Sequence, residues 1–207
     1  MPYSPARKCI YVWVPKTAGT SMANAFKKRK IFEKKDQETL WGRIPEDQRE
    51  LYQASNWQHV KALDVIKLIG QEEWDRCFKF TIVRNPYDRL VSFYTYSKSA
   101  RQDPSSVQYG LEDPGSFEEW LEVTKPLDQL HYIADETGRV LVDYVGKFEN
   151  LRADVFKISL KMKTWPIRLP KLNASKRRDY HEYYTPEIRR RVEELYGDEI
   201  ETLKYQF

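Results

Sequence analysis

The sequence is poor in the residues that build metal sites and covalent scaffolds. It holds two cysteines and three histidines in 207 residues. Cys9 and Cys77 lie inside separate apolar stretches, where a thiol is usually a small buried hydrophobe, so we expect two reduced structural side chains. The histidines, at 59, 131 and 181, are too far apart for zinc-ligand spacing. We therefore expect no disulfide framework and no dedicated metal site.

Long apolar runs are also missing. A membrane helix needs roughly 20 consecutive apolar residues, and no window of this chain approaches that length. The first residues lack the apolar core and the small-residue cleavage site of an export signal. These absences predict a cytoplasmic chain with no membrane span.

The remaining composition is that of a globular protein. Hydrophobic residues make up 41% of the chain, charged residues 32% and aromatic residues 14%, which argues against a disordered or fibrous protein. A length of 207 residues allows a sizeable core but crowds two ordinary domains. We therefore expect a single domain over residues 1–207.

Positive charge is concentrated in two segments. The net charge is +4, yet residues 27–35 contain six basic residues against one acidic, and residues 163–178 contain six against none. The rest of the chain therefore has a net charge of −7. An acidic body with two basic patches suits a small, strongly anionic ligand better than a nucleic acid, which favours a broad basic surface. We expect no nucleic-acid partner.

Two strand-loop-helix units are readable from the apolar pattern. Residues 9–14 form a buried strand pattern followed by a helix over 21–30, and residues 78–83 form a second strand pattern. Pro86 suits the first turn of a helix that extends to about residue 97, because the missing N–H is not needed there.

The other elements alternate in the same way. The patterns predict short strands at 56–60 and 140–148, and helices at 64–69, 117–123, 150–162 and from Thr185–Pro186 onward. This order predicts an α/β fold with three layers, in which helices flank a mainly parallel sheet. The polar residues 99–116 form a loop that is too long for a simple connection, and we expect it to face a substrate.

The loop after the first strand has the composition of an anion site. It places hydroxyl, glycine and lysine residues between a buried strand and a helix N-terminus, where unpaired N–H groups and the helix dipole favour an anion. The candidate residues are Pro15, Lys16, Thr17, Ala18, Gly19, Thr20 and Ser21. An ordinary glycine turn with a Ser or Thr cap is the simpler interpretation. The nucleotide-triphosphatase pattern G-x-x-x-x-G-K-[ST] is absent.

Two ordered motifs resemble the sulfotransferase superfamily. VPKTAGTS, at 14–21, is similar to its 5′-phosphosulfate loop, and FTIVRNPYDRLVSFY, at 80–94, is similar to its 3′-phosphate site. Weaker similarity continues through YVGKFENL, LNASKRRDY and the last helix. The resemblance is greatest to the carbohydrate branch that includes uronyl 2-O-sulfotransferases. It implies 3′-phosphoadenosine 5′-phosphosulfate (PAPS) as donor and 3′-phosphoadenosine 5′-phosphate (PAP) as product. Because the resemblance includes Golgi enzymes, a trimmed catalytic domain of such an enzyme is the alternative to a cytoplasmic protein. We expect the acceptor specificity of such an enzyme to lie in the 99–116 loop.

The resemblance also implies residue roles. Lys16 is expected to stabilise the leaving phosphate oxygen, and the loop around it to bind the 5′-phosphosulfate. Arg84 and Ser92 are expected to bind the 3′-phosphate, with further contacts implied from Ser175, Lys176 and Arg177. Arg84 also has a physical argument, because it follows a strand and its planar fork suits a phosphate. For Arg89 we favour a structural ion pair.

The acceptor proton needs a base, and His59 is the best candidate because imidazole titrates near neutrality. The uronyl branch has a similar His-Val segment with this role. His131, His181, Asp64 and the acidic residues of the 99–116 loop are the alternatives.

The sequence therefore predicts a sulfotransferase that acts on a hydroxyl of a carbohydrate or small metabolite. A kinase-like phosphotransferase is the second hypothesis, weakened by the missing P-loop pattern. A non-catalytic nucleotide or polyanion binder of the same fold is the third.

Overall fold

The computed structural model describes residues 3–46, 49, 58–100, 115–169 and 177–207. The chain divides into two compact units. One comprises Met1–Val83 and Gln129–Leu172 and is called the sheet unit below; the other comprises Arg84–Asp128 and Asn173–Phe207 and is called the helical unit. The expected single domain stays a prediction.

Within the described residues, the sheet unit contains four strands in the order β1-β2-β3-β4. Their bounds are β1 Tyr3–Ser4, β2 Cys9–Tyr11, β3 Phe78–Val83 and β4 Tyr144–Lys147. β2, β3 and β4 run parallel, with Tyr11 opposite Phe80 and Phe80 opposite Tyr144, whereas β1 pairs antiparallel with β2. The predicted α/β fold with a mainly parallel sheet is confirmed.

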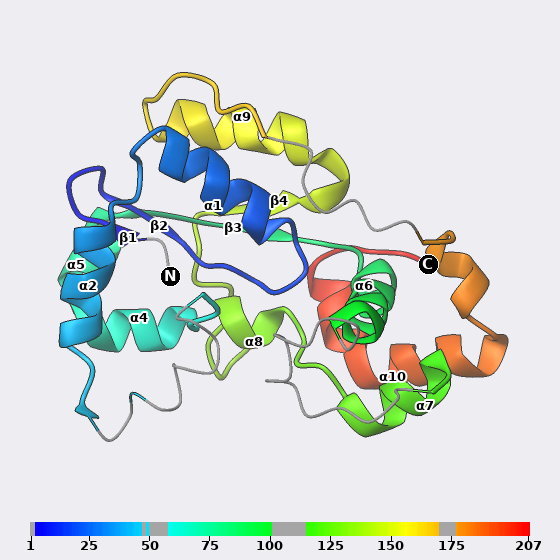
Figure 1. The fold of residues 1–207 in the computed structure, drawn as a ribbon. Coiled ribbons are helices and arrows are strands. Elements are labelled where there is room, and N and C mark those ends of the chain that lie inside the picture. The colour runs from blue at the N-terminus through cyan, green and yellow to red at the C-terminus, as the bar shows by residue number, and fades with distance from the viewer. Residues whose placement is uncertain (1–2, 47–48, 50–57, 101–114, 170–176) are drawn as a thin grey trace. The chain divides into compact units, whose positions relative to one another are not determined.

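Helices cover both faces of this sheet (Figure 1). α1 (Gly19–Lys28) and α9 (Leu151–Lys161) lie on one face, and α4 (Ala62–Ile69) and α8 (Leu130–Ile133) on the other. Alternate strand residues point to the α1 and α9 side, as a period of two requires. The buried core on that side contains Cys9, Tyr11, Trp13, Met22, Phe26, Phe80, Ile82, Val155 and Ile158.

β2, which corresponds to the first strand that the sequence predicts, ends earlier than expected. The apolar run continues to Val14, but the strand stops at Tyr11. The N–H of Val12 still donates to the carbonyl of Phe80 at 2.9 Å, after which the chain leaves the ladder and enters the loop. Burial, which Trp13 and Val14 both retain, is therefore not evidence of strand pairing.

Among the described residues, the short helices α2 (Lys34–Gly42), α5 (Gln71–Arg76) and α8 were not predicted. The strand predicted at 56–60 is wrong for residues 58–60, because 58 and 59 form a bend and 60 is irregular. Residues 56 and 57 lie outside the described part. The apolar residue at position 60 is explained by burial and not by sheet pairing, since Val60 is 1% exposed but lies outside the strands.

The helical unit contains α6 (Pro86–Ala100), α7 (Phe117–Thr124), the 3-10 helix η4 (Tyr180–Tyr183) and α10 (Pro186–Thr202). The predicted start of α10 is confirmed, because the Thr185 hydroxyl accepts from the N–H of Ile188 at 3.3 Å. Half of the buried core residues that these helices share are aromatic. This core comprises Tyr87, Leu90, Val91, Tyr94, Phe117, Trp120, Leu121, Ile188, Val192 and Tyr196.

Cys9 and Cys77 are both buried and unbridged, as expected. Burial is the main cause that raises the pKa of the Cys9 thiol to about 12 and of the Cys77 thiol to about 11. Both are therefore protonated and unreactive at neutral pH. None of the helices in the described ranges is both long and apolar enough to cross a membrane.

Candidate active site

The anion loop has the geometry of a strained strand-to-helix turn. Lys16 and Ala18 both adopt positive φ angles, of 67° and 68°, which L-residues rarely do. Ala18 is the N-cap of α1 and has no side-chain group that can cap the helix, and no acidic residue lies in the first turn. The N-terminal N–H groups of α1 are therefore not neutralised by a local carboxylate, a condition that suits an anionic ligand.

Gly19 is required by the tryptophan beside it. A Cβ built on Gly19 would lie 1.5 Å from Nε1 of Trp13 and 1.8 Å from Cε2, closer than any real contact. A glycine in an anion loop commonly allows the backbone to approach a ligand closely. The structure shows a different cause, because the Trp13 indole already occupies the space that a side chain would need.

The hydroxyls of the loop differ in their surroundings. Thr17 is fully buried, and its hydroxyl donates to the carbonyl of Val14 at 2.8 Å. Because this proton is used within the loop, the backbone N–H of Thr17 is the donor that this residue can offer to a ligand. Thr20 is exposed and Ser21 is buried, at 7% exposure, in the first turn of α1. Pro15 is buried and Lys16 is half-buried.

His59 is held next to this loop by Trp13. Its Nδ1 lies 2.9 Å from the carbonyl oxygen of Trp13, and its ring packs edge-on against the Trp13 indole at 5.3 Å and the Tyr132 ring at 6.4 Å between centroids. Burial lowers the pKa of His59 below its ordinary value; the hydrogen bond to Trp13 opposes this, and the Lys16 charge adds to the lowering. The imidazole is therefore neutral at pH 7.

The hydrogen bond also fixes the tautomer. A carbonyl oxygen only accepts, so Nδ1 of His59 carries the proton and donates it to Trp13. In the neutral ring the lone pair is then on Nε2, the position from which an imidazole accepts a proton. Because the Lys16 charge acts on the His59 pKa, the two predicted catalytic residues lie within electrostatic reach of each other.

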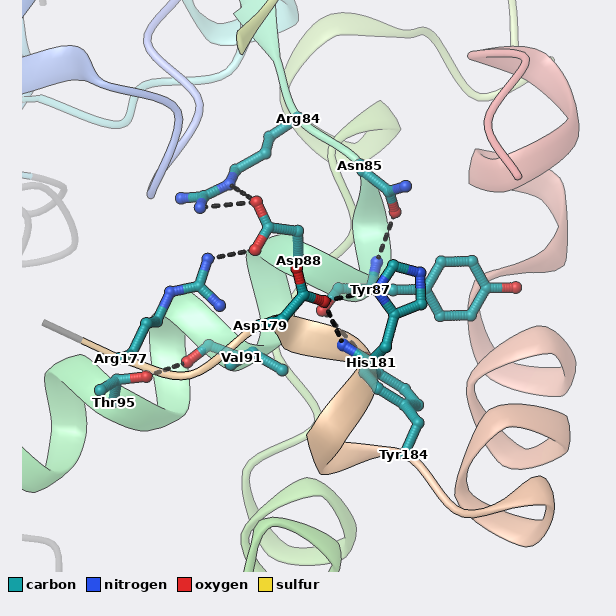
Figure 2. Close-up of polar contacts among 10 residues, drawn as sticks. All are labelled: Arg84, Asn85, Tyr87, Asp88, Val91, Thr95, Arg177, Asp179, His181 and Tyr184. Carbon is teal, nitrogen blue, oxygen red and sulfur yellow. Dashed lines mark hydrogen bonds and ion pairs between the residues drawn. The ribbon is translucent and has the colours of Figure 1, made fainter. Parts of the chain in front are cut away.

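In the helical unit, two of the predicted 3′-phosphate residues share one carboxylate (Figure 2). Nε of Arg84 donates to Oδ2 of Asp88 at 2.7 Å, and Nη2 of Arg84 lies 2.7 Å from the same oxygen. Nη2 of Arg177 donates to Oδ1 of Asp88. All three side chains are mostly buried. The structure thus brings together Arg84 and Arg177, which are 93 positions apart.

Ser92 lies on α6 four residues after Asp88, and therefore one turn away on the same face. Its neighbour in the motif, Arg89, has another role. Arg89 is 1% exposed, its Nη2 donates to the carbonyl of Leu127 at 2.7 Å, and it lies 3.7 Å from Oε2 of the buried Glu199. The structural interpretation of Arg89 is supported by these contacts.

Other predicted residues are less well placed or not described. Ser175 and Lys176 lie outside the described residues, as do 101–114 of the expected acceptor loop. His181 is half-exposed, bonds Asp179 through Nδ1 and stacks on a tyrosine.

Two further base candidates have polar or aromatic neighbours of their own. Asp64 pairs with Lys67 at 3.7 Å, and the His131 ring packs edge-on against Tyr132 at 5.3 Å between centroids. Within the described ranges, no group of three or more His, Cys, Asp or Glu residues is arranged to hold a metal ion.

Sequence reasoning missed two residues of this arrangement. Asp88 had a usable signal, since it stands four positions after Arg84, which is ion-pair spacing. Trp13 had no such signal in the sequence, because its role depends on contacts with His59, 46 positions later, and with Gly19.

Comparison with known proteins agrees with the motif analysis. A model described as Sulfotransferase family matches residues 2–206, nearly the whole chain. No individual curated protein matches the chain.

Proposed function

Because this chain belongs to the sulfotransferase family and is therefore a sulfotransferase, we propose that it transfers a sulfuryl group from PAPS to a hydroxyl of a carbohydrate or small metabolite. The observation that carries this proposal is the arrangement around Trp13. Its carbonyl holds a neutral His59, and its indole packs against the loop that contains Lys16.

The donor carries a 5′-phosphosulfate and a 3′-phosphate, and the chain offers groups suited to each of them. In the sheet unit, the loop from Pro15 to Ser21 supplies N–H groups of the α1 N-terminus and the Lys16 ammonium for the 5′-phosphosulfate. In the helical unit, Arg84 and Arg177 supply guanidinium groups for the 3′-phosphate, and Ser92, Ser175 and Lys176 are proposed to add to them. Nη1 of Arg177 is buried and has no hydrogen-bond partner among the described residues, so an additional acceptor fits there.

His59 is the proposed general base. Its lone pair on Nε2 accepts the proton of the acceptor hydroxyl as the oxygen of that hydroxyl bonds to sulfur. The buried ring is neutral at pH 7, and its Nδ1–H is anchored to Trp13, so the imidazolium formed keeps its orientation. The proton then leaves from Nε2 to solvent.

Lys16 is the proposed electrostatic catalyst. As the bond between sulfur and the bridging phosphate oxygen breaks, negative charge grows on that oxygen. The positive charge of Lys16 stabilises this oxygen without a proton transfer. The strained backbone at Lys16 and Ala18 supports the proposal, because positive φ angles persist only where the surrounding structure maintains them.

A transfer assay tests the proposed function. The protein is incubated with donor labelled in the sulfate group and with panels of neutral sugars, uronate-containing oligosaccharides and small alcohols. We expect labelled product with at least one acceptor panel, and loss of that product in Lys16→Met and His59→Asn. If the acceptor is labelled when ATP with a labelled terminal phosphate replaces PAPS, the result would instead support the kinase-like alternative.

A further inference from the structure

We propose that Asp88 is a positioning residue that presents Arg84 and Arg177 to the 3′-phosphate of the donor. The proposal rests on the function proposed above and adds a residue that neither the motif analysis nor the family match assigns to the site. It follows from the contacts drawn in Figure 2.

The carboxylate of Asp88 uses each oxygen for a different arginine. Oδ2 accepts from Nε and lies within 2.7 Å of Nη2 of Arg84, and Oδ1 accepts from Nη2 of Arg177. Arg84 precedes α6, Asp88 stands in the first turn of α6, and Arg177 precedes η4. One side chain therefore fixes two guanidinium groups that come from separate parts of the helical unit.

Burial makes this arrangement more than a surface ion pair. The exposed side-chain fractions are 10% for Arg84, 17% for Asp88 and 11% for Arg177. Exposed pairs contribute little because water and salt screen them, whereas buried charges interact strongly and are costly to leave unpaired. Without Asp88, two mostly buried guanidinium groups would repel each other and turn toward solvent.

The three groups together keep one positive charge. Two guanidinium groups and one carboxylate sum to +1, so the cluster remains attractive to phosphate while its geometry is held. Nη1 of Arg177 is buried with no hydrogen-bond partner in the described part of the chain, which identifies a donor that the carboxylate does not satisfy. A phosphate oxygen is an acceptor of the kind this donor needs.

The test compares two ligands that differ only in the 3′-phosphate. Kd is measured by calorimetry for PAP and for adenosine 5′-phosphate, with the wild-type protein and with Asp88→Asn. Asparagine keeps the shape of the side chain but can accept from only one arginine through its single carbonyl oxygen. We expect PAP affinity to fall about 10- to 100-fold, by analogy with the loss that follows removal of a residue that orients a metal ligand. Affinity for adenosine 5′-phosphate should stay unchanged.

Asp179→Asn is the matched control. Asp179 lies two residues from Arg177 but bonds His181, so this variant should leave the PAP preference as in the wild type. Thermal unfolding of each variant establishes that it is folded. If Asp88→Asn does not fold, Asp88→Glu replaces it, because one added methylene displaces the carboxylate and should also weaken PAP selectively.

Three results would overturn the proposal. Unchanged PAP affinity in a folded Asp88 variant shows that the arginines do not need it. Tighter PAP binding shows that Asp88 is a competitor of the phosphate and not its support. Equal wild-type affinity for PAP and adenosine 5′-phosphate overturns the 3′-phosphate assignment itself, and with it both this proposal and that part of the proposed function.

Discussion

The carbonyl oxygen of Trp13 accepts a hydrogen bond from Nδ1 of His59 at 2.9 Å. The same tryptophan places its indole where a side chain at position 19 would be. One residue just beyond β2 therefore supports both the proposed base and the anion loop. This relationship accounts for the apolar run beyond the last paired residue, since Trp13 and Val14 are buried to shape the site and not to extend the sheet.

Replacement of His59 by Asn should lower kcat by about 10²- to 10⁴-fold, the usual contribution of a general base, while the Kd for PAP stays unchanged. Turnover assays and calorimetry on the same preparation measure the two quantities. His131→Asn is the control, because His131 lies near the same Tyr132 ring but is not the proposed base. Wild-type turnover in His59→Asn would remove His59 from the mechanism.

The pH dependence of kcat/KM follows from the pKa of His59. Burial lowers this pKa from the ordinary value of 6.5, and a base works only when deprotonated. We therefore expect kcat/KM to fall on the acid side with a midpoint below pH 6.5. A profile measured with saturating PAPS checks this. An acid limb with a midpoint at 7 or higher contradicts the proposed state of the imidazole.

Gly19→Ala should destabilise the protein by about 1–3 kcal/mol, the cost of overpacking, because its Cβ would overlap the Trp13 indole. Urea unfolding measures the change in free energy of unfolding. Gly42→Ala is the matched control: Gly42 lies in α2 with no atom near its Cβ position, and alanine there should be neutral or stabilise by about 0.5–1 kcal/mol. Equal effects of the two substitutions would argue against the packing explanation.

Arg84→Gln should weaken PAP binding by about 1.5–3 kcal/mol, the scale of a charge-assisted hydrogen bond. It should leave adenosine 5′-phosphate binding unchanged, because that ligand has no 3′-phosphate. Arg190→Gln provides the control, since Arg190 is an exposed member of an α10 ion pair at 3.9 Å. A parallel loss for both ligands would place Arg84 elsewhere than at the 3′-phosphate.

Glu199→Gln should destabilise the fold by about 3–5 kcal/mol and leave PAP affinity unchanged in the molecules that remain folded. The reason is that Arg89 and Glu199 are 1% and 0% exposed in their side chains, so the substitution leaves a buried guanidinium without its counter-charge. Urea unfolding measures the first effect and calorimetry at low temperature the second. A selective loss of PAP affinity would instead indicate that Arg89 contributes to PAP binding.

The sequence predicted those helices and strands whose signals come from neighbouring residues. Strand β3 and the start of α10 are confirmed at Phe78 and Pro186, because a continuous apolar run and a Thr-Pro cap each depend on adjacent residues. The strand expected at 56–60 is wrong over 58–60, since the apolar character of Val60 reflects burial by distant elements.

In the candidate site, too, residues with a local signal could be predicted and residues that depend on distant contacts could not. Lys16 and Arg84 could be identified because each lies in a short motif beside a strand. The role of Asp88 as a shared partner could not be predicted with Arg177, because that pairing spans 89 positions and depends on how η4 packs on α6. Residue types are visible in the sequence, but the partners that orient them are set by tertiary contacts.

The most direct test of the central claim is a pair of calorimetric titrations of the wild-type protein, one with PAP and one with ATP. The claim is that the chain recognises a nucleotide with separate 5′ and 3′ anionic groups. It predicts saturable PAP binding at least 10-fold tighter than ATP binding. Preference for ATP, or no binding of either nucleotide, would contradict it.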